Sequence, residues 1–263
     1  MYHDVPFKVS PMEEIEIDIK EARSIYGKVT RAFLVNGDAF VLPAPRLAVI
    51  AEKILTDFPE IETISCYASI HNIMNKSMED LQTLRRLKID ELNIGVESGS
   101  DAVLKQFNKG YSLDDAYEQL GRLKAAGIKY GLNIIIGASG SGQYHENAQA
   151  NARLLNETQP YLIFTGGLHY DQGCALFDAA RDGRFIDNTL EQLLLEELEM
   201  LEALTLKNSY FFGLHPSNAI PISGRLPEEQ GQMIKKFRRA MSVIPEQVLH
   251  SIPRRGKEGR ILL

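Results

Sequence analysis

Strand-like and helical segments alternate along this chain at a spacing of roughly 30 residues, which is the length of a βαβ unit. Short apolar runs typical of buried strands occur at residues 31–36, 63–67, 92–96, 129–136 and 161–165. Because helical crossovers join parallel strands, the alternation predicts one mainly parallel sheet with helices packed outside it. Five clear strands are too few for a closed eight-stranded barrel, so we expect a partial barrel or an open sheet.

Several helix boundaries can be predicted from individual residues. The helical apolar pattern of residues 12–26 stops at Gly27, and glycine ends helices readily because it tolerates a left-handed conformation. Ser77 and Ser112 each precede a carboxylate by three residues, which is the spacing of a capping box at a helix start. These signals place helices between the predicted strands, as the alternation requires.

The length of 263 residues permits one large α/β domain or two smaller ones. We expect a barrel domain over residues 1–225, to which residues 208–214 contribute one more short strand, and a basic helical extension over residues 226–263. With 44% hydrophobic and 24% charged residues, the composition suits a globular protein that buries a substantial core.

Charge and cysteine content narrow the classes of partner. The formal net charge of −6 gives no electrostatic footprint for nucleic acid or an anionic membrane. No stretch approaches the ~18 apolar residues of a membrane span, and no signal-peptide pattern opens the chain. Cys66 and Cys174 lie far apart in sequence, which argues against a disulfide framework and favours a reducing compartment. We therefore expect a cytoplasmic protein that binds small molecules.

Polar residues gather where the predicted strands end. In the stretch ELNIGVESGS, residues 91–100, an apolar strand ends abruptly in Glu97 and Ser98. The carboxyl ends of parallel strands meet at one edge of a sheet, where ligands bind. Each polar pair alone is typical of an ordinary surface loop. The whole set favours a polar binding site for a ligand with an amine, a carboxylate and ribose hydroxyls. The pairs are Gly37 with Asp38, Ala68 with Ser69, Glu97 with Ser98, Asn133 with Gly137, and Gly166 with Gly167.

The remaining motifs argue against several enzyme classes. The glycine-rich run GASGSG at residues 137–142 has neither the Walker form nor the Rossmann glycine spacing. The six histidines show no metal-binding spacing, although His215 in the segment HPSN is the best candidate among them. No serine lies in a Gly-x-Ser-x-Gly elbow, and no predicted strand ends in a lysine that would indicate an aldolase.

Several of these segments together resemble the radical S-adenosylmethionine superfamily, in particular its branch related to coproporphyrinogen dehydrogenase and the elongator-type proteins. Asn36-Gly37-Asp38-Ala39 resembles the second-strand motif, which holds the methionine amine. Residues 93–100, followed by Asn108-Lys109-Gly110, resemble the fourth-strand motif. Residues 133–137 resemble the fifth-strand motif, which lies near the adenine, and residues 215–227 are similar to the closing segment of that branch.

The resemblance implies a partial (β/α)6 barrel, similar to a TIM barrel, that binds S-adenosylmethionine at the carboxyl ends of its strands. It also implies a 4Fe–4S cluster, held by three cysteines, whose electron releases a radical that abstracts hydrogen from a substrate. From the resemblance we expect Glu97 to pair with the amine or with ribose, and Asp38 to accept from the amine. The residues expected to contact the nucleoside cofactor are Gly37, Asp38, Ala39, Ser69, Glu97, Ser98, Asn133, Ile135 and Gly137.

The sequence departs from the family pattern at its start. In the family, the CxxxCxxC loop follows the first strand and lies just upstream of a segment like residues 1–7. This sequence contains neither that strand nor that loop. Cys66 and Cys174 offer two thiolates where such a cluster needs three or four. We therefore expect a barrel that lacks its first strand, with residues 31–36 as an exposed edge. Two hypotheses remain: the core of a radical oxidoreductase whose cluster loop lies upstream, or a non-catalytic barrel that binds a nucleoside or a partner.

Overall fold

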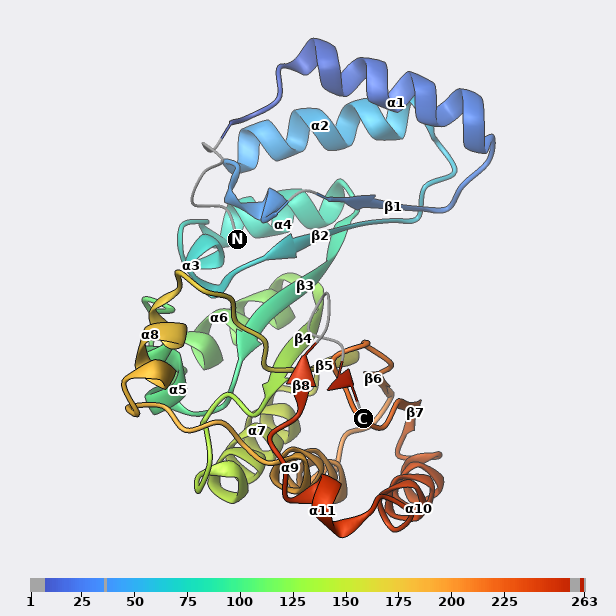
Figure 1. Ribbon diagram of the computed structural model, residues 1–263. Coiled ribbons are helices and arrows are strands. Elements are labelled where there is room, and N and C mark those ends of the chain that lie inside the picture. The colour runs from blue at the N-terminus through green and yellow to red at the C-terminus, as the bar shows by residue number, and fades with distance from the viewer. Residues whose placement is uncertain (1–7, 36, 256–260, 263) are drawn as a thin grey trace.

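The computed structural model describes residues 8–35, 37–255 and 261–262 of the chain. Within them, seven strands form one sheet whose spatial order follows the order along the chain (Figure 1). The strands β1 to β6 run parallel, and β7 is antiparallel to β6. The predicted α/β class, with a mostly parallel sheet of the partial-barrel type, is confirmed. The strands are β1 (Arg31–Leu34), β2 (Thr63–Ala68), β3 (Ile89–Glu97), β4 (Lys129–Ile136), β5 (Leu162–Gly167), β6 (Ser209–Gly213) and β7 (Ile222–Leu226).

One or two helices follow each of the strands β1 to β5 and lead back to the start of the next strand. They are α2 (Ala44–Asp57) after β1, α3 (Ile70–Met74) and α4 (Met78–Arg86) after β2, α5 (Asp101–Gln106) and α6 (Leu113–Ala126) after β3, α7 (Tyr144–Thr158) after β4, and α8 (Ala175–Arg181) and α9 (Leu190–Ala203) after β5. The remaining elements are α1 (Met12–Tyr26), the 3-10 helix η1 (Ala39–Val41), α10 (Gln230–Met241), α11 (Glu246–Leu249) and the strand pair β8 (Arg254–Arg255) and β9 (Ile261–Leu262).

The helices cover one face of the sheet, because only that face carries a continuous set of large aliphatic side chains. In β3, Leu92, Ile94 and Val96 are fully buried, whereas Asn93 and Gly95 between them stay partly exposed on the opposite face. This period of two is the ordinary alternation of a strand, and the second half of β4 repeats it. We call the helix-covered face the outer face and the face with Asn93 and Gly95 the inner face.

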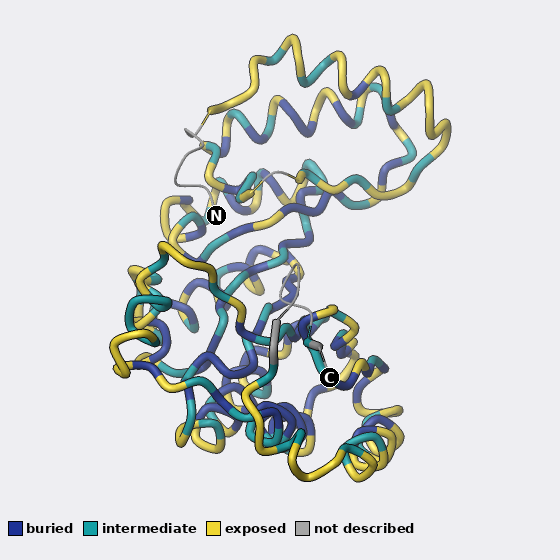
Figure 2. The backbone as a smooth tube through the Cα atoms, viewed as in Figure 1, coloured by how far each residue is buried: buried dark blue, intermediate teal, exposed yellow. Residues whose placement is uncertain are grey.

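Burial is greatest in the middle of the molecule and lowest at its periphery. Figure 2 shows buried backbone along the central strands and along α9, while α1 is exposed over most of its length and buries only Ile19. Among the described residues, no helix combines the length and the apolar character that crossing a membrane requires.

The local signals for helix boundaries agree with the structure. Ser77 and Ser112 both form complete capping boxes, in which the serine Oγ accepts a hydrogen bond from the amide of Asp80 or Asp115. Gly27 ends α1 with a φ of 60°, which glycine adopts without a steric penalty. These boundaries depend on neighbouring residues alone, which explains why the sequence predicts them well.

The C-terminal region contains three strands that the sequence did not predict. The strand β7 was not recognised because Ser223, Gly224 and Arg225 break its apolar pattern, and glycine has a low strand propensity. The strands β8 and β9 add a short antiparallel pair to the expected helices. The predicted domain boundary between residues 225 and 226 falls within β7, and α10 packs on α9 and β7. A division into two domains stays a prediction.

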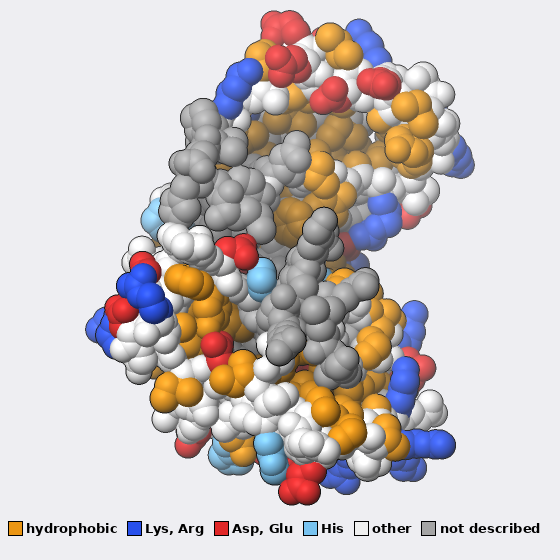
Figure 3. Space-filling model, viewed as in Figure 1, with side chains coloured by type: hydrophobic (Ala, Val, Ile, Leu, Met, Phe, Trp, Pro, Cys, Tyr) orange, Lys and Arg blue, Asp and Glu red, His pale blue; other side chains and the backbone are white. Residues whose placement is uncertain are grey.

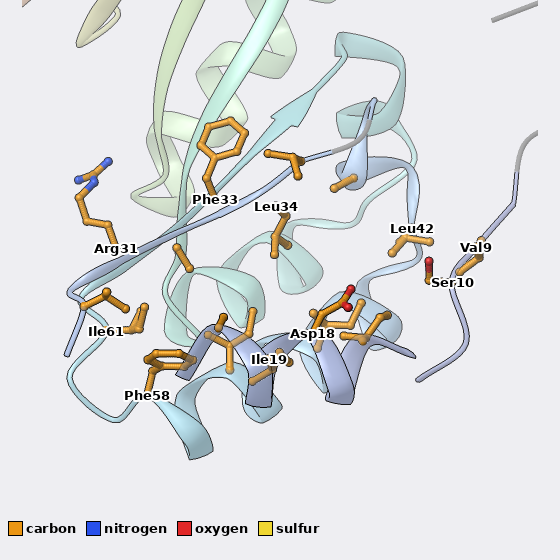
Figure 4. A pocket seen from close by; sticks show the side chains of 18 of the residues that line it. Val9, Ser10, Asp18, Ile19, Arg31, Phe33, Leu34, Leu42, Phe58 and Ile61 are labelled. Atoms are coloured by element: carbon orange, nitrogen blue, oxygen red, sulfur yellow. The ribbon is translucent and has the colours of Figure 1, made fainter. Parts of the chain in front are cut away.

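The strand β1 lies at one edge of the sheet, beside an apolar hollow. Among the described strands β1 pairs only with β2, so the exposed edge predicted from the sequence is confirmed. A cavity of about 660 Å³ lies between α1, α2 and β1, and Ile19, Leu34 and Phe58 are among its lining residues (Figure 4). Figure 3 shows hydrophobic side chains gathered in this hollow beneath α1.

Candidate functional site

The carboxyl ends of β1 to β5 lie at one edge of the parallel sheet, which we call the rim. All nine sequence-predicted site residues lie on these strand ends or directly after them. Asn36, which the family resemblance also included, lies outside the described residues. The rim is built from residues 37–39, 69, 97, 133–136 and 166–167, and Ser98 and Gly137 follow directly behind it.

At the ends of β1 and β2, one asparagine ties two of the predicted residues together. Asn72 Nδ2 donates a hydrogen bond of 2.5 Å to Asp38 Oδ2, and the amide of Asn72 donates to Ser69 Oγ, which caps α3. Asp38 Oδ1 is buried and has no hydrogen-bond partner among the described residues. A buried acceptor without a partner is costly, so this oxygen suits a donor from a ligand. Gly37, with a φ of 80°, and Ala39, the first residue of η1, flank the carboxylate.

At the end of β3, Glu97 occupies a strained backbone conformation. Its φ is 75°, in the left-handed region, and the register between β3 and β4 shifts between Gly95 and Glu97. The Glu97 carboxylate folds back over Gly95 on the inner face. Its Oε1 lies so close to the glycine that an added Cβ would be only 2.4 Å from this oxygen. Lys109 Nζ donates to the same oxygen at 3.1 Å. Glu97 therefore presents a fixed, charge-balanced acceptor at the rim.

Replacing Gly95 with alanine tests whether this placement of the carboxylate matters. The new methyl group would displace the flexible end of the Glu97 side chain rather than the backbone, so we expect a stability change below about 1 kcal/mol. We expect the affinity for a nucleoside ligand to fall about tenfold, the equivalent of one good hydrogen bond. Urea unfolding and titration calorimetry measure the two quantities, and Gly121→Ala, with open space around its Cα, is the matched control.

At the end of β4, Asn133 and Ile135 lie on the inner face. The register pairs Asn133 with Gly95, which places the amide beside the Glu97 carboxylate. The register between β4 and β5 also pairs Ile135 with Gly166, which has no side chain. Sequence-predicted residues from two strands are thus brought together at the centre of the rim.

Two predicted residues, Ser98 and Gly137, lie behind the rim rather than on it. Ser98 is fully buried and donates a hydrogen bond of 2.6 Å to Asn147 Oδ1 on α7. The amide of Gly137 donates to Glu196 Oε2 at 3.1 Å, and Asn147 Nδ2 donates to Glu196 Oε1 at 2.8 Å. One carboxyl group of α9 thus holds the end of β4 directly and the end of β3 through Asn147.

The sequence analysis missed this carboxyl group and its neighbour. Burial raises the pKa of Glu196 to about 8 and that of Glu197 to about 7, and Thr165 Oγ1 donates to Glu197 Oε1 at 2.8 Å. A signal was present: Glu197 lies three residues after Leu194 and four before Leu201, within the apolar stripe of the helix. A carboxylate at that spacing indicates a buried acid with a specific partner.

The segment HPSN ties the ends of β5 and β6 together. Ser217 Oγ accepts a hydrogen bond of 2.8 Å from the amide of Gly167, and lies 2.6 Å from His215 Nδ1. Asn218 Nδ2 donates to the carbonyl oxygens of Thr165 and Gly213 at 3.0 and 3.1 Å. His215, the best candidate for a metal ligand in the sequence, therefore lies in a turn that joins two strand ends, with its Nδ1 beside Ser217.

A second cavity, of about 310 Å³, borders the end of β4. Gly137, Tyr170, Asp187 and Asn188 are among its lining residues. Tyr170 donates a hydrogen bond of 2.6 Å to Asp187 Oδ2, and Asn188 Nδ2 donates to the carbonyl oxygen of Gly137 at 3.2 Å. The second of these bonds holds the carbonyl group of Gly137, the residue whose amide donates to Glu196.

The two cysteines do not form a cluster site. Cys66 lies on the outer face of β2, fully buried, and burial raises the pKa of its thiol to about 12. Cys174 lies before α8, where its Sγ accepts a hydrogen bond from the amide of Phe177. Among the described residues, no three or more histidine, cysteine, aspartate or glutamate side chains group as metal ligands. The residues present therefore do not fit a cluster that needs three thiolates.

Comparison with solved structures shows the same fold in several enzymes. An N-terminally truncated Elp3 of the archaeon Methanocaldococcus infernus has a TM-score of 0.60 at 14% identity, over 88% of this chain and 59% of that one. Coproporphyrinogen III oxidase (HemN) of Escherichia coli, described as a radical SAM enzyme, has a TM-score of 0.56 at 16% identity, over 73% and 43%. Methylornithine synthase (PylB) has a TM-score of 0.55 at 14% identity, over 80% and 58%. This chain thus spans less than two thirds of each of these proteins.

Sequence comparison identifies the family. Comparison with curated protein sequences finds no significant match. The sequence profile of the Radical SAM superfamily matches residues 3–142, just over half of the chain, and this segment includes the ends of β1 to β4. The family implies S-adenosylmethionine and a 4Fe–4S cluster as cofactors. The chain, whose likeness extends to elongator- and HemN-type folds, therefore belongs to the radical SAM superfamily.

Proposed function

We propose that this chain binds S-adenosylmethionine along the rim, at the carboxyl ends of β1 to β4. The observation that carries the proposal is the conformation of Glu97, whose left-handed φ of 75° holds the carboxylate over Gly95. Strain of this kind costs about 1–3 kcal/mol and persists where a site needs it. Membership of the superfamily supplies the identity of the ligand.

The hydrogen bonds that Asp38 and Glu97 already accept suggest which part of S-adenosylmethionine each carboxylate would bind. Glu97 Oε1 already accepts from the Lys109 ammonium, so a second cation gains little there, and ribose hydroxyls suit the remaining acceptor sites. Asp38 accepts from a neutral amide on one oxygen and leaves Oδ1 without a partner among the described residues. We therefore assign the methionine amine to Asp38 and the ribose to Glu97. Asn133 and Ile135 would flank the adenine.

We assign binding and orientation to these residues, and no redox step. The cluster that supports radical chemistry in the family does not fit Cys66 and Cys174, which lie on different elements. The same observation favours a second candidate function, a barrel that binds a nucleoside without transforming it. Hydrogen-atom abstraction from a substrate by the whole protein is the first hypothesis for its reaction class.

Titration calorimetry with two ligands tests the assignment of the acids. Adenosine carries the ribose but lacks the amine, so Asp38→Asn is expected to weaken S-adenosylmethionine about tenfold or more and leave adenosine unchanged. Glu97→Gln is expected to weaken both ligands. The control is Glu13→Gln, an exposed carboxylate in the first turn of α1. Absence of heat with S-adenosylmethionine, while circular dichroism shows an intact fold, would contradict the proposal.

A further inference from the structure

We propose that the inner face of the sheet binds a neutral, planar ring whose edge carries N–H and C=O groups, and that this ring belongs to the substrate. Three features of the described inner face point to this chemistry. They are a flat central floor with amide groups, aromatic walls on both sides, and a base whose charges are paired. As a substrate site it rests on the proposed function, because Glu97 borders both the rim and the floor.

The floor lies over β3 and β4, where glycine and asparagine alternate. A Cβ added at Gly131 would lie 2.9 Å from Asn93 Oδ1, so the absence of a side chain there makes room for the asparagine amide. Asn93 Oδ1 is buried and lacks a hydrogen-bond partner among the described residues. One step closer to the rim, Asn133 pairs with Gly95, and there the Glu97 carboxylate fills the space above the glycine. Primary amides both donate and accept, so this floor matches a ligand edge that does the same.

Aromatic side chains stand on both sides of this floor. Phe164 of β5 and Phe212 of β6 are stacked, with ring centroids 5.3 Å apart and planes 18° apart. Phe33 of β1 and Tyr67 of β2 meet edge to face at 5.0 Å, and both are about 40% exposed. Large aromatic groups left exposed beside polar groups are typical of a surface that stacks on ligands.

The strand register aligns these groups in rows across the sheet. Tyr67 pairs with Asn93, which pairs with Gly131. One step closer to the rim, Asn133 pairs with Phe164, which pairs with Phe212. Three strand spacings of about 4.8 Å place the backbones of β2 and β5 roughly 14 Å apart. We infer from this span a bicyclic or tricyclic ring that would lie between the aromatic side chains with its polar edge over the amides.

At the base of the described inner face, the charge of Glu91 is paired with that of Arg31. Glu91 Oε1 accepts hydrogen bonds from Arg31 at 2.5 Å, from Tyr161 Oη at 2.7 Å and from Ser65 Oγ at 3.3 Å. Glu91 Oε1 therefore has three donors, and Arg31 offsets the charge of the carboxylate, which makes this group a poor partner for a cationic ligand. Hydrogen bonding along the edge and stacking along the face remain as the means of recognition, which favours a neutral ring.

Lumiflavin, a neutral fluorescent tricycle with an N–H and two carbonyl groups on one edge, is a suitable probe. Fluorescence titration is done with the full chain in saturating S-adenosylhomocysteine, so that the rim is already occupied. We expect Phe212→Leu to weaken lumiflavin about tenfold, the effect of losing one stacking partner, and Phe212→Tyr to retain binding. We expect Tyr26→Leu, an exposed aromatic of α1 outside the inner face, to have no effect.

The amide floor is tested separately with 3-methyllumiflavin, which lacks the N–H donor. Wild-type protein is expected to bind it at least fivefold more weakly than lumiflavin, and Asn93→Ala should remove this difference. Equal binding by Phe212→Leu and wild type, no binding of lumiflavin at all, or displacement of lumiflavin by S-adenosylhomocysteine would overturn the proposal. If S-adenosylhomocysteine fails to bind but lumiflavin binding still depends on Phe212, the proposed function fails and the ring site stands.

Discussion

Replacing Glu97 with glycine is expected to abolish nucleoside binding while leaving the fold about as stable as the wild type. The left-handed φ of 75° costs a non-glycine residue about 1–2 kcal/mol, which glycine recovers. Glycine in turn loses about 0.5–1 kcal/mol of backbone entropy, and the partly exposed pair with Lys109 contributes at most about 1 kcal/mol. Urea unfolding measures the stability, and calorimetry with S-adenosylmethionine measures the binding.

The comparison with Glu97→Ala separates strain from lost chemistry. Alanine removes the same carboxylate but keeps the strained backbone, so Glu97→Ala should be about 1 kcal/mol less stable than Glu97→Gly, with the same loss of binding. Asn208→Gly is the control, because Asn208 also has a positive φ, of 59°, but lies between α9 and β6, away from the rim. Full binding by Glu97→Gly would show that the strained carboxylate has no part in ligand recognition.

The sequence predicts those parts of the fold that depend on neighbouring residues. The strand β4 was predicted with the bounds that it has, because KYGLNIII lies between a helix-ending glycine and a glycine turn. Parallel order then follows from the helical crossovers, and it places the carboxyl ends of the parallel strands at one edge. Asp38, Glu97 and Asn133 reach the rim for this reason alone.

The orientation of individual side chains was harder to predict. Ser98 follows Glu97 directly and was grouped with it, yet the period of two in a strand turns it to the outer face, where Asn147 accepts its hydrogen bond. Gly137 has a φ of 86°, and an added Cβ would meet Leu193 at 2.6 Å, so this glycine packs against α9. Proximity to a strand end is therefore insufficient evidence for contact with a ligand.

Long-range contacts could not be predicted from the sequence. Nothing near Glu196 indicates that it accepts from the amide of Gly137, 59 residues earlier in the chain. Likewise, the sequence does not distinguish Gly95 from the other glycines. In the structure, the folded-back carboxylate of Glu97 occupies the space that a side chain at Gly95 would need. Such relationships depend on the packing of α9 on α7 and on the register shift in β3, which only the assembled fold provides.

Replacing Glu196 with leucine is expected to destabilise the fold by about 2–5 kcal/mol. The change leaves two buried donors, the Gly137 amide and Asn147 Nδ2, without an acceptor, and each such group costs about 1–3 kcal/mol. Glu196→Gln keeps an acceptor for the Gly137 amide, and rotation of the Asn147 amide restores the second hydrogen bond. We therefore expect the glutamine variant to stay within about 1 kcal/mol of the wild type at pH 5, measured by urea unfolding.

The same variant is expected to flatten the dependence of stability on pH. Burial raises the pKa of Glu196 to about 8 in the folded state, whereas the unfolded chain has the ordinary value near 4.5. The unfolded state therefore releases its proton first, and stability falls as the pH rises from about 4.5 to 8, by a few kcal/mol in order of magnitude. Glu196→Gln removes this fall, and the remaining slope comes mainly from Glu197, whose pKa is raised to about 7. Glu202→Gln, on the exposed side of α9, should keep the wild-type slope between pH 5 and 8, and an equal slope in Glu196→Gln would show that the carboxyl group is ionised throughout.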